Sequence, residues 1–178
     1  PVEQLNALGI FDSRTVAAHC LALSETDMAI LVEKGVYVAR TPITYMKLAM
    51  PVNQISDLKA AGMSRLALGS DGPASNAVMD MWEIMRQQVW LEKYLRLDPE
   101  AVPGDTALRM ASQVSARAMG FENSGTLVEG AAADLILVDI DKPHFRPRHN
   151  LIASLVHTGK GADVTHVIAD GRLLMRNR

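Results

Sequence analysis

Short apolar runs that alternate with helical patterns constrain the fold of this chain more than any other feature. The apolar runs cover residues 15–20, 36–39 and 65–69, and helical patterns separate them. Two parallel strands need a crossover connection, and a helix usually supplies it. This tight alternation therefore predicts parallel β/α units in the N-terminal part of the chain.

Two of these runs end at a side chain that can carry acid–base or metal chemistry. Residues 66–70 lead directly into Asp71, which is followed by a glycine, and residues 15–18 lead into His19. In β/α barrels the residues at the carboxyl ends of the strands carry the chemistry. Asp71 and His19 are therefore the predicted site residues.

Each of these residues also has a structural interpretation. Asp71 could ligate a divalent cation and accept a proton from its bound water, or it could cap a helix that begins near Ser75. His19 could be a metal ligand, a general acid–base group or an oxyanion stabiliser, or a hydrogen-bonded histidine beside a strand end. Cys20 would point to the opposite face of an extended strand from His19, so we expect it to pack. The residues alone leave these alternatives open.

Helices are expected at about residues 2–9, 24–35, 51–62, 78–95 and 106–119. The best-marked start is Ser24, because Asp27 three residues later completes a capping box. Gly35 marks the end of the same helix. These signals place one helix in each connection between the expected strands.

The last quarter of the chain has a different character. Residues 135–139 and 164–175 are strand-like, and Asp170-Gly171 is a strong hairpin turn. We therefore expect a small β unit beside the α/β part. The remaining histidines lack the spacing of metal ligands and are expected in loop or surface roles; they are His144, His149, His157 and His166.

Length and composition narrow the function classes. The chain has 178 residues, whereas a complete eight-unit barrel takes about 250. Its net charge is −2, with 18 basic and 20 acidic residues, which argues against nucleic acid as a partner. No apolar stretch approaches the roughly 20 residues of a membrane span. A single cysteine suits a reducing compartment, so a cytoplasmic location is expected.

Taken together, these segments resemble the amidohydrolase superfamily. The likeness is to its branch of metal-dependent deaminases and chlorohydrolases that act on heterocyclic rings, such as methylthioadenosine/S-adenosylhomocysteine deaminases and triazine hydrolases. The matching segments follow one another in the family's order and are Pro1-Val2-Glu3-Gln4-Leu5, Ala18-His19-Cys20, Lys47-Leu48-Ala49, Gly69-Ser70-Asp71-Gly72-Pro73-Ala74-Ser75-Asn76, Leu108-Arg109-Met110-Ala111, Gly125-Thr126-Leu127-Val128-Glu129-Gly130 and Val167-Ile168-Ala169-Asp170-Gly171.

The resemblance implies the C-terminal portion of a TIM-like (β/α)8 barrel, about strands six to eight with their helices, followed by part of a small β-sandwich. It implies a domain at residues 1–122 that carries His19 and Asp71, and a second at 123–178. Asp71 would be the strand-eight metal ligand and proton shuttle, and His19 would hydrogen-bond the substrate or the developing tetrahedral centre.

The resemblance also implies the reaction and its cofactor. The full enzyme would hydrolyse a C–N or C–halogen bond of a small heterocyclic substrate with a water activated by a divalent metal, zinc or iron. The family's other metal ligands would lie upstream of Pro1, in the N-terminal half of the barrel. We therefore expect the 178-residue chain to be inactive on its own.

One segment departs from the family's pattern. Where relatives tend to show His-Asn-Pro-x-Ser-Asn after strand seven, this chain has Arg40-Thr41-Pro42-Ile43-Thr44-Tyr45. The change alters hydrogen-bond donors and bulk at the expected rim of the substrate site. The expected rim residues are Arg40, Thr44, Tyr45, Ser75 and Asn76.

A second hypothesis belongs to a different class. The chain could be a stand-alone, non-catalytic protein that reuses the half-barrel fold for binding or assembly. The exposed strand edges and apolar faces of an open half-barrel would then need a cover, either a partner or a second copy in a homodimer.

Overall fold

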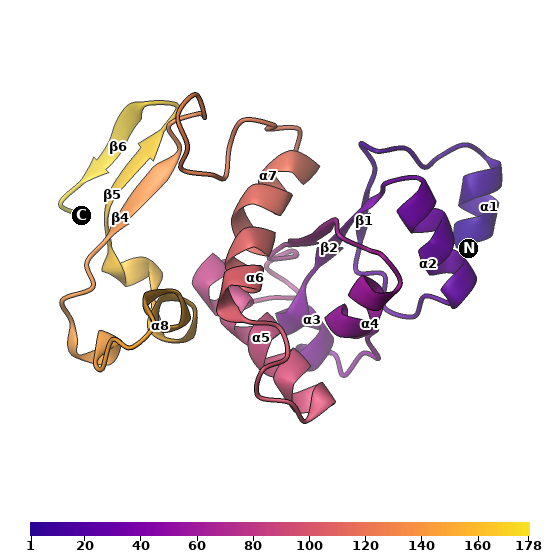
Figure 1. Ribbon diagram of the computed structural model, residues 1–178, viewed down its shortest axis with the longest axis horizontal. Coiled ribbons are helices and arrows are strands. Elements are labelled where there is room, and N and C mark those ends of the chain that lie inside the picture. The colour runs from indigo at the N-terminus through magenta and orange to yellow at the C-terminus, as the bar shows by residue number, and fades with distance from the viewer.

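Three short parallel strands form the centre of the N-terminal unit. The computed structural model describes residues 1–178, and these strands are β1 (Val16–Ala18), β2 (Tyr37–Arg40) and β3 (Leu66–Leu68), in the order β1-β2-β3. Ala17 pairs with Val38 in the register of the first pair of strands. The predicted parallel β/α arrangement is confirmed, with β1 beside β2 (Figure 1). By the strand order, β1 and β3 are the two edges of this sheet.

The helix after β1 forms as the sequence predicts. In α2 (Glu25–Glu33) the Ser24 hydroxyl accepts from the Asp27 backbone N–H at 3.1 Å, and the Asp27 carboxylate accepts from the Ser24 N–H at 3.0 Å. Gly35 follows the helix with φ +64°, a conformation that costs glycine little. This capping box satisfies backbone N–H groups that would otherwise have no partner at the start of the helix.

Two of the connections differ from the sequence pattern. A six-residue helix, α3 (Pro42–Lys47), follows β2 directly, where the pattern indicated none. The next helix, α4 (Ile55–Ala60), begins four residues later than the expected start at Pro51. The reason is a distant cap, because the Glu92 carboxylate accepts from the backbone N–H groups of Ile55 and Ser56, each at 2.9 Å.

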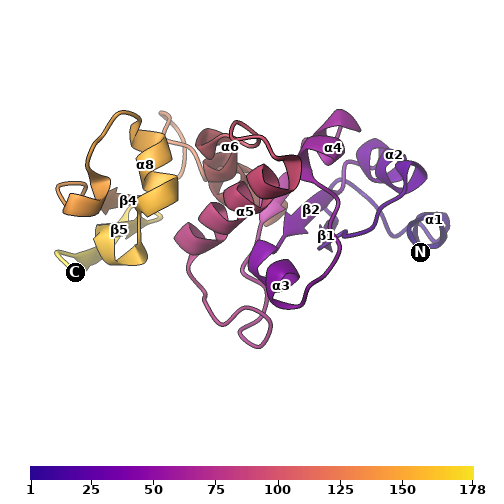
Figure 2. The same cartoon turned by 90° about the horizontal axis from the view of Figure 1, so that it is seen from below.

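A layer of helices covers the sheet and separates it from the C-terminal end (Figure 2). Its members are α5 (Met81–Arg96), α6 (Gly104–Arg109), a π-helical turn (Met110–Val114) and α7 (Ser115–Ala118). The core lies between this layer and the strands, where Val38, Leu66, Ile84 and Val89 are each no more than 2% exposed. At the opposite end of the molecule from the C-terminal sheet lies α1 (Val2–Ala7).

The C-terminal unit is an antiparallel sheet with a helix beside it. The strands β4 (Leu135–Val138), β5 (Val164–Ala169) and β6 (Arg172–Arg176) pair in that order. Asp170 and Gly171 join β5 to β6 with φ +48° and +72°, so the predicted hairpin is confirmed. The structure shows one antiparallel sheet here and no second sheet packed on it, so the expected β-sandwich stays a prediction; the expected boundary at residue 122 falls in the connection between α7 and β4.

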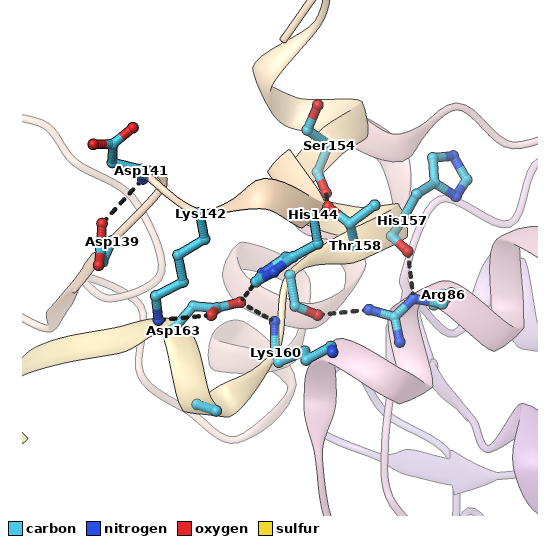
Figure 3. Close-up of polar contacts among 12 residues, drawn as sticks. Arg86, Asp139, Asp141, Lys142, His144, Ser154, His157, Thr158, Lys160 and Asp163 are labelled. Atoms are coloured by element: carbon cyan, nitrogen blue, oxygen red, sulfur yellow. Dashed lines mark hydrogen bonds and ion pairs between the residues drawn. The ribbon is translucent and has the colours of Figure 1, made fainter. Parts of the chain in front are cut away.

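Another helix, α8 (Leu151–Thr158), lies where the sequence pattern indicated only a β unit. It packs against α5 and α6, and its side chain Val156 is fully buried. Arg86 of α5 reaches the end of α8 and donates to the carbonyl oxygens of His157 at 2.8 Å and Gly159 at 2.6 Å. This arginine ties the two units of the chain together (Figure 3).

A buried carboxylate organises the loops around the C-terminal sheet. Asp163 is 2% exposed, and it lies at the end of the 3-10 turn η3 (Gly161–Asp163). Its oxygens accept from Lys142 Nζ at 3.0 Å, His144 Nε2 at 2.9 Å and the Lys160 N–H at 3.0 Å (Figure 3). These three hydrogen bonds offset the free-energy cost of removing the charged carboxylate from water.

None of the helices combines the length and the apolar character needed to cross a membrane.

Candidate functional site

The two predicted site residues lie at the same end of the parallel sheet, where the strands have their carboxyl ends. His19 follows the last residue of β1, and Asp71 follows β3 by a turn of two residues. Both have a left-handed backbone, with φ +69° at His19 and +62° at Asp71. This conformation is uncommon for residues other than glycine, and it clusters at functional sites. Seven other non-glycine residues share positive φ, so the case for these two positions rests on the chemistry of their side chains and on where they lie.

The Asp71 carboxylate is held at both oxygens. Its Oδ1 accepts from the Gly72 backbone N–H at 2.7 Å, and its Oδ2 accepts from the Thr44 hydroxyl at 2.8 Å. The Gly72 N–H, then the Thr44 hydroxyl and, more weakly, the charge of His19 hold the pKa of Asp71 below its ordinary value, against a smaller opposing effect of burial. The carboxylate is therefore ionised at neutral pH, as a metal ligand must be.

The helix-cap interpretation of Asp71 is wrong. Residues 73–75 form a turn, and no helix begins near Ser75. The next helix is α5, whose cap is Asp80, because the Asp80 carboxylate accepts from the Trp82 N–H at 2.8 Å. The Asp71 carboxylate instead accepts from the Gly72 N–H in its own loop and from the Thr44 hydroxyl of α3.

His19 is fixed by the segment that follows β2. Its Nδ1 lies 3.0 Å from the Thr41 hydroxyl, and its ring meets the edge of the Tyr45 ring with centroids 6.0 Å apart. The His19 N–H continues the ladder of β1 by donating to the Ala39 carbonyl at 2.9 Å. The imidazole is therefore oriented through Nδ1, which leaves Nε2 without a protein partner.

Cys20 packs as expected, although for a different reason. With φ +51° it is not in an extended strand, so the alternation of strand faces does not apply to it. It is partly buried against the hydrophobic core, and burial raises the pKa of its thiol. A thiol with a raised pKa is a poor nucleophile at neutral pH.

Arg40 lies beneath the expected rim. Its side chain is fully buried, and it donates from Nη1 to the His19 carbonyl at 3.1 Å and from Nη2 to the Asn53 carbonyl at 2.8 Å. The guanidinium also lies over the Tyr45 ring, 5.0 Å from its centroid. Arg40 thus braces the turn that carries His19 and has no exposed surface in this structure.

The other expected rim residues are mostly buried as well. Thr44, Tyr45 and Asn76 are at most 4% exposed, and Ser75 is half-buried. Asn76 donates from Nδ2 to the Ser70 carbonyl at 2.6 Å, which closes the loop that carries Asp71. Of these side chains only Ser75, whose hydroxyl also lowers the pKa of Asp71, keeps a substantial exposed surface beside the site.

Thr41 is the residue at this site that the sequence analysis did not single out. It directly follows β2, the strand between the two strands that carry His19 and Asp71. Its position in the sequence, directly after an expected strand, could have indicated a place in the site, because the carboxyl ends of adjacent parallel strands lie at the same end of the sheet. The Thr41 hydroxyl lies 3.0 Å from His19 Nδ1, whereas the contact with Asp71 is made by Thr44 three residues later.

The chain supplies at most part of a metal site. Residues 1–178 contain no group of three or more His, Cys, Asp or Glu side chains placed to hold a metal ion. Each oxygen of Asp71 accepts one hydrogen bond from the protein, which leaves lone-pair capacity for a cation. Asp71 thus fits the role of one ligand, whereas zinc takes about four.

A cavity elsewhere in the chain lies away from this site. It measures about 790 Å³ and is lined by Arg14, Tyr37 and Arg65, which lie at or just before the amino ends of the strands. In β/α barrels the catalytic groups are at the other end of the strands. The site at His19 and Asp71 is therefore the better candidate for chemistry.

Comparisons with known proteins agree on one family. The sequence model of the amidohydrolase family matches residues 1–174. The chain is 45% identical to the 5-methylthioadenosine/S-adenosylhomocysteine deaminase of Dictyoglomus thermophilum, over the whole chain and 42% of that protein. It is 44% identical to the enzyme of the same name from Pelotomaculum thermopropionicum, over the whole chain and 41% of that protein. The chain thus spans about two fifths of the length of these relatives.

Solved structures give the same result for the fold. An adenosine deaminase from Xanthomonas campestris, with bound zinc, matches the whole chain with a TM-score of 0.94 at 32% identity, over 40% of its own length. The atrazine chlorohydrolase of Arthrobacter aurescens, complexed with zinc, matches 99% of the chain with a TM-score of 0.90 at 24% identity, over 39% of its length.

Proposed function

The chain belongs to the amidohydrolase family, and from this premise we propose that it is the C-terminal part of a metal-dependent hydrolase. The full-length protein would cleave a C–N bond of a heterocyclic substrate, with a deamination as the reaction; a C–halogen bond is the alternative. The relatives at 45% and 44% identity, which are named as deaminases, support the C–N bond.

One observation carries the proposal. His19 and Asp71 are far apart in the sequence, yet both lie at the carboxyl edge of the sheet and both receive a hydrogen bond or a close polar contact from the same short segment after β2. An acid–base pair held in this way at the end of parallel strands is the arrangement in which β/α barrels perform chemistry.

The roles follow from the chemistry of each side chain. We propose zinc as the metal, as in the adenosine deaminase from Xanthomonas campestris; when bound, it would lower the pKa of its water ligand towards about 7. Asp71 is ionised, so it can bind the cation and accept a proton. His19 presents its free Nε2 to the substrate, and Ser75 lines the rim. We also propose a cytoplasmic location, which the single cysteine supports.

Exposed apolar side chains between α1 and β1 and in β1 itself are the starting point of the second candidate, a stand-alone binding or assembly protein. Leu8 is 75% exposed, Ile10 54% and Val16 of β1 42%. A homodimer would cover such a surface. The missing N-terminal half of the barrel would cover it equally well, and the chain's coverage of only 42% of its relative favours this explanation.

The test is an assay of the full-length protein from the same reading frame. Zinc-loaded protein is incubated with methylthioadenosine, S-adenosylhomocysteine, adenosine and a chlorinated triazine, and ammonia and chloride release are measured. We expect ammonia release from at least one purine nucleoside. A well-folded, zinc-loaded protein that releases neither product from any of the four compounds would overturn the proposal.

A further inference from the structure

Two threonines of one short segment contact the two site residues. Thr41 precedes α3 as its N-cap residue, and its hydroxyl lies 3.0 Å from His19 Nδ1. Thr44, in the first turn of α3, donates to Asp71 Oδ2 at 2.8 Å. The two threonines are 5% and 4% exposed. Both threonines are therefore shielded from solvent. A single turn of the chain contacts both His19 and Asp71.

This turn is itself held firmly. The Thr41 backbone N–H donates to the Tyr45 hydroxyl at 2.8 Å, so the first turn of α3 is closed by a side chain. Arg40 lies over the same tyrosine ring and donates to the His19 carbonyl. Pro42 is the first residue of the helix and fixes its φ. The hydroxyls of Thr41 and Thr44 are consequently presented from a rigid support.

The direction of the Thr44 hydrogen bond follows from the groups involved, whereas that of the Thr41–His19 hydrogen bond depends on the tautomer of the imidazole. An ionised carboxylate only accepts, so Thr44 uses its one hydroxyl proton on Asp71 Oδ2. The Thr41 hydroxyl has no other partner in the structure than His19 Nδ1. If Thr41 donates to Nδ1, the neutral imidazole carries its proton on Nε2 and offers an N–H donor away from the threonine.

We propose that Thr41 and Thr44 are positioning residues of this site: Thr44 fixes the carboxylate of Asp71, and Thr41 selects the Nε2–H form of His19. This inference rests on the proposed function. It assigns Thr44 the role of holding Asp71 in place, whereas the family resemblance implied that Thr44 lies at the rim and contacts the substrate. Partners of this kind, one shell outside the metal ligands, typically change metal affinity or activity by 10- to 100-fold when they are removed.

The test for Thr44 uses full-length protein and two readouts. Thr44→Val and Thr44→Ala remove the hydroxyl, whereas Thr44→Ser keeps it. For the first two variants we expect zinc affinity, measured by competition with a chelator, and kcat to fall about 10- to 100-fold with KM within about twofold. Thr44→Ser should stay within about threefold of wild type, because the donor is retained. Alanine is included because the valine methyl group could disturb the turn.

The matched control is Thr106→Val, on α6. Thr106 is 9% exposed, and its hydroxyl makes no hydrogen bond in the structure. We expect wild-type zinc affinity and kcat for this variant. The Thr44 assignment is overturned if Thr44→Val and Thr44→Ala match wild type in both readouts, or if Thr44→Ser loses as much as Thr44→Val.

The test for Thr41 is the protonation state of one imidazole. Full-length protein is labelled with ¹⁵N-histidine, and the His19 signals are identified by their loss in His19→Asn. We expect a protonated Nε2 and an unprotonated Nδ1 in wild type and Thr41→Ser, and a shift towards a tautomer mixture in Thr41→Val. A protonated Nδ1 in wild type, or an unchanged spectrum in Thr41→Val, overturns the assignment. If wild type has no activity, the proposed function fails, while the zinc and NMR readouts still decide this inference.

Discussion

At the scale of single residues, the site is defined by side chains whose backbone is strained and whose polar atoms are held. Asp71 and His19 both have positive φ, and each is oriented by a threonine from the segment after β2. That these two side chains lie at the carboxyl ends of parallel strands in one sheet could be predicted from the sequence, because each follows an apolar run. Their supports could not, since the contact of Thr44 with Asp71 joins residues on different connections.

The first residue-scale prediction concerns Asp71. Asp71→Asn in the full-length protein keeps the shape of the side chain but removes the charge and the ability to accept a proton. We expect kcat/KM to fall by about 10²- to 10⁴-fold. The control is Asp98→Asn, because Asp98 is exposed and lies in the loop after α5. Near-normal turnover of Asp71→Asn would contradict the assigned role.

Arg40 shows the limit of prediction at this scale. The family resemblance implied a position at the rim of the substrate site, but the structure places its guanidinium in the core, hydrogen-bonded to backbone carbonyls. A long charged side chain usually lies at the surface unless it is paired. The exception arises because carbonyls of two turns converge on it, which no local pattern indicates.

At the scale of elements, features that depend on contacts between residues close in sequence could be predicted. Features that depend on contacts between distant elements could not. The capping box of α2 and the hairpin of β5 and β6 form as predicted, because their hydrogen bonds join residues close in sequence. The structure begins α4 at Ile55 and not at Pro51, because the side chain that caps its first N–H groups, Glu92, belongs to α5 and leaves no signal near the helix in the sequence. The helix α8 was missed because its apolar face is defined by packing on α5 and α6.

The capping box gives an element-scale prediction. Ser24→Ala in the full-length protein removes the acceptor for the Asp27 N–H at the start of α2. We expect the free energy of unfolding to fall by about 1 kcal/mol, measured by urea denaturation. Ser24→Thr retains the acceptor and serves as the control. A loss below about 0.2 kcal/mol for Ser24→Ala would show that the cap contributes nothing.

The network around Asp163 predicts a pH dependence. Burial alone would raise the pKa of Asp163, but the hydrogen bonds from His144, Lys142 and the Lys160 N–H outweigh it and leave the pKa lowered. A carboxyl with a lowered folded pKa stabilises the protein above its unfolded pKa of about 3.9, and this contribution is lost as the pH falls through the folded value.

Asp163→Asn tests this network. We expect the variant to be less stable by about 3 kcal/mol at pH 7, and the difference from wild type to shrink below about pH 4. Urea denaturation of the full-length protein at several pH values measures both. Asp141→Asn is the control, since the Asp141 side chain is 81% exposed. A difference that does not depend on pH would contradict the pKa argument.

At the scale of the whole molecule, the chain spans about two fifths of the length of its amidohydrolase relatives. It contributes three adjacent strands of a parallel sheet, an additional antiparallel sheet and one candidate metal ligand. A metal ion that takes about four ligands cannot be held tightly by one carboxylate. If the chain is the C-terminal part of a longer protein, as we propose, an upstream segment would both pair with the open edge of β1 and supply the other metal ligands.

Metal content gives the prediction at this scale. After dialysis, elemental analysis should find about one zinc per full-length protein and far less than one in the 178-residue chain. Tight, stoichiometric zinc in the 178-residue chain would contradict the view that most of the ligands lie upstream. Asp71→Asn in the full-length protein should lower zinc retention, because one ligand loses its charge.

The sequence of the reading frame upstream of Pro1 tests the central claim most directly. If the chain is the C-terminal part of an amidohydrolase, the frame should continue upstream for about 250 residues, as its 42% coverage of a relative implies. That segment should contain a His-x-His pair that supplies the missing metal ligands. A start codon immediately before Pro1 would contradict the account for this gene product.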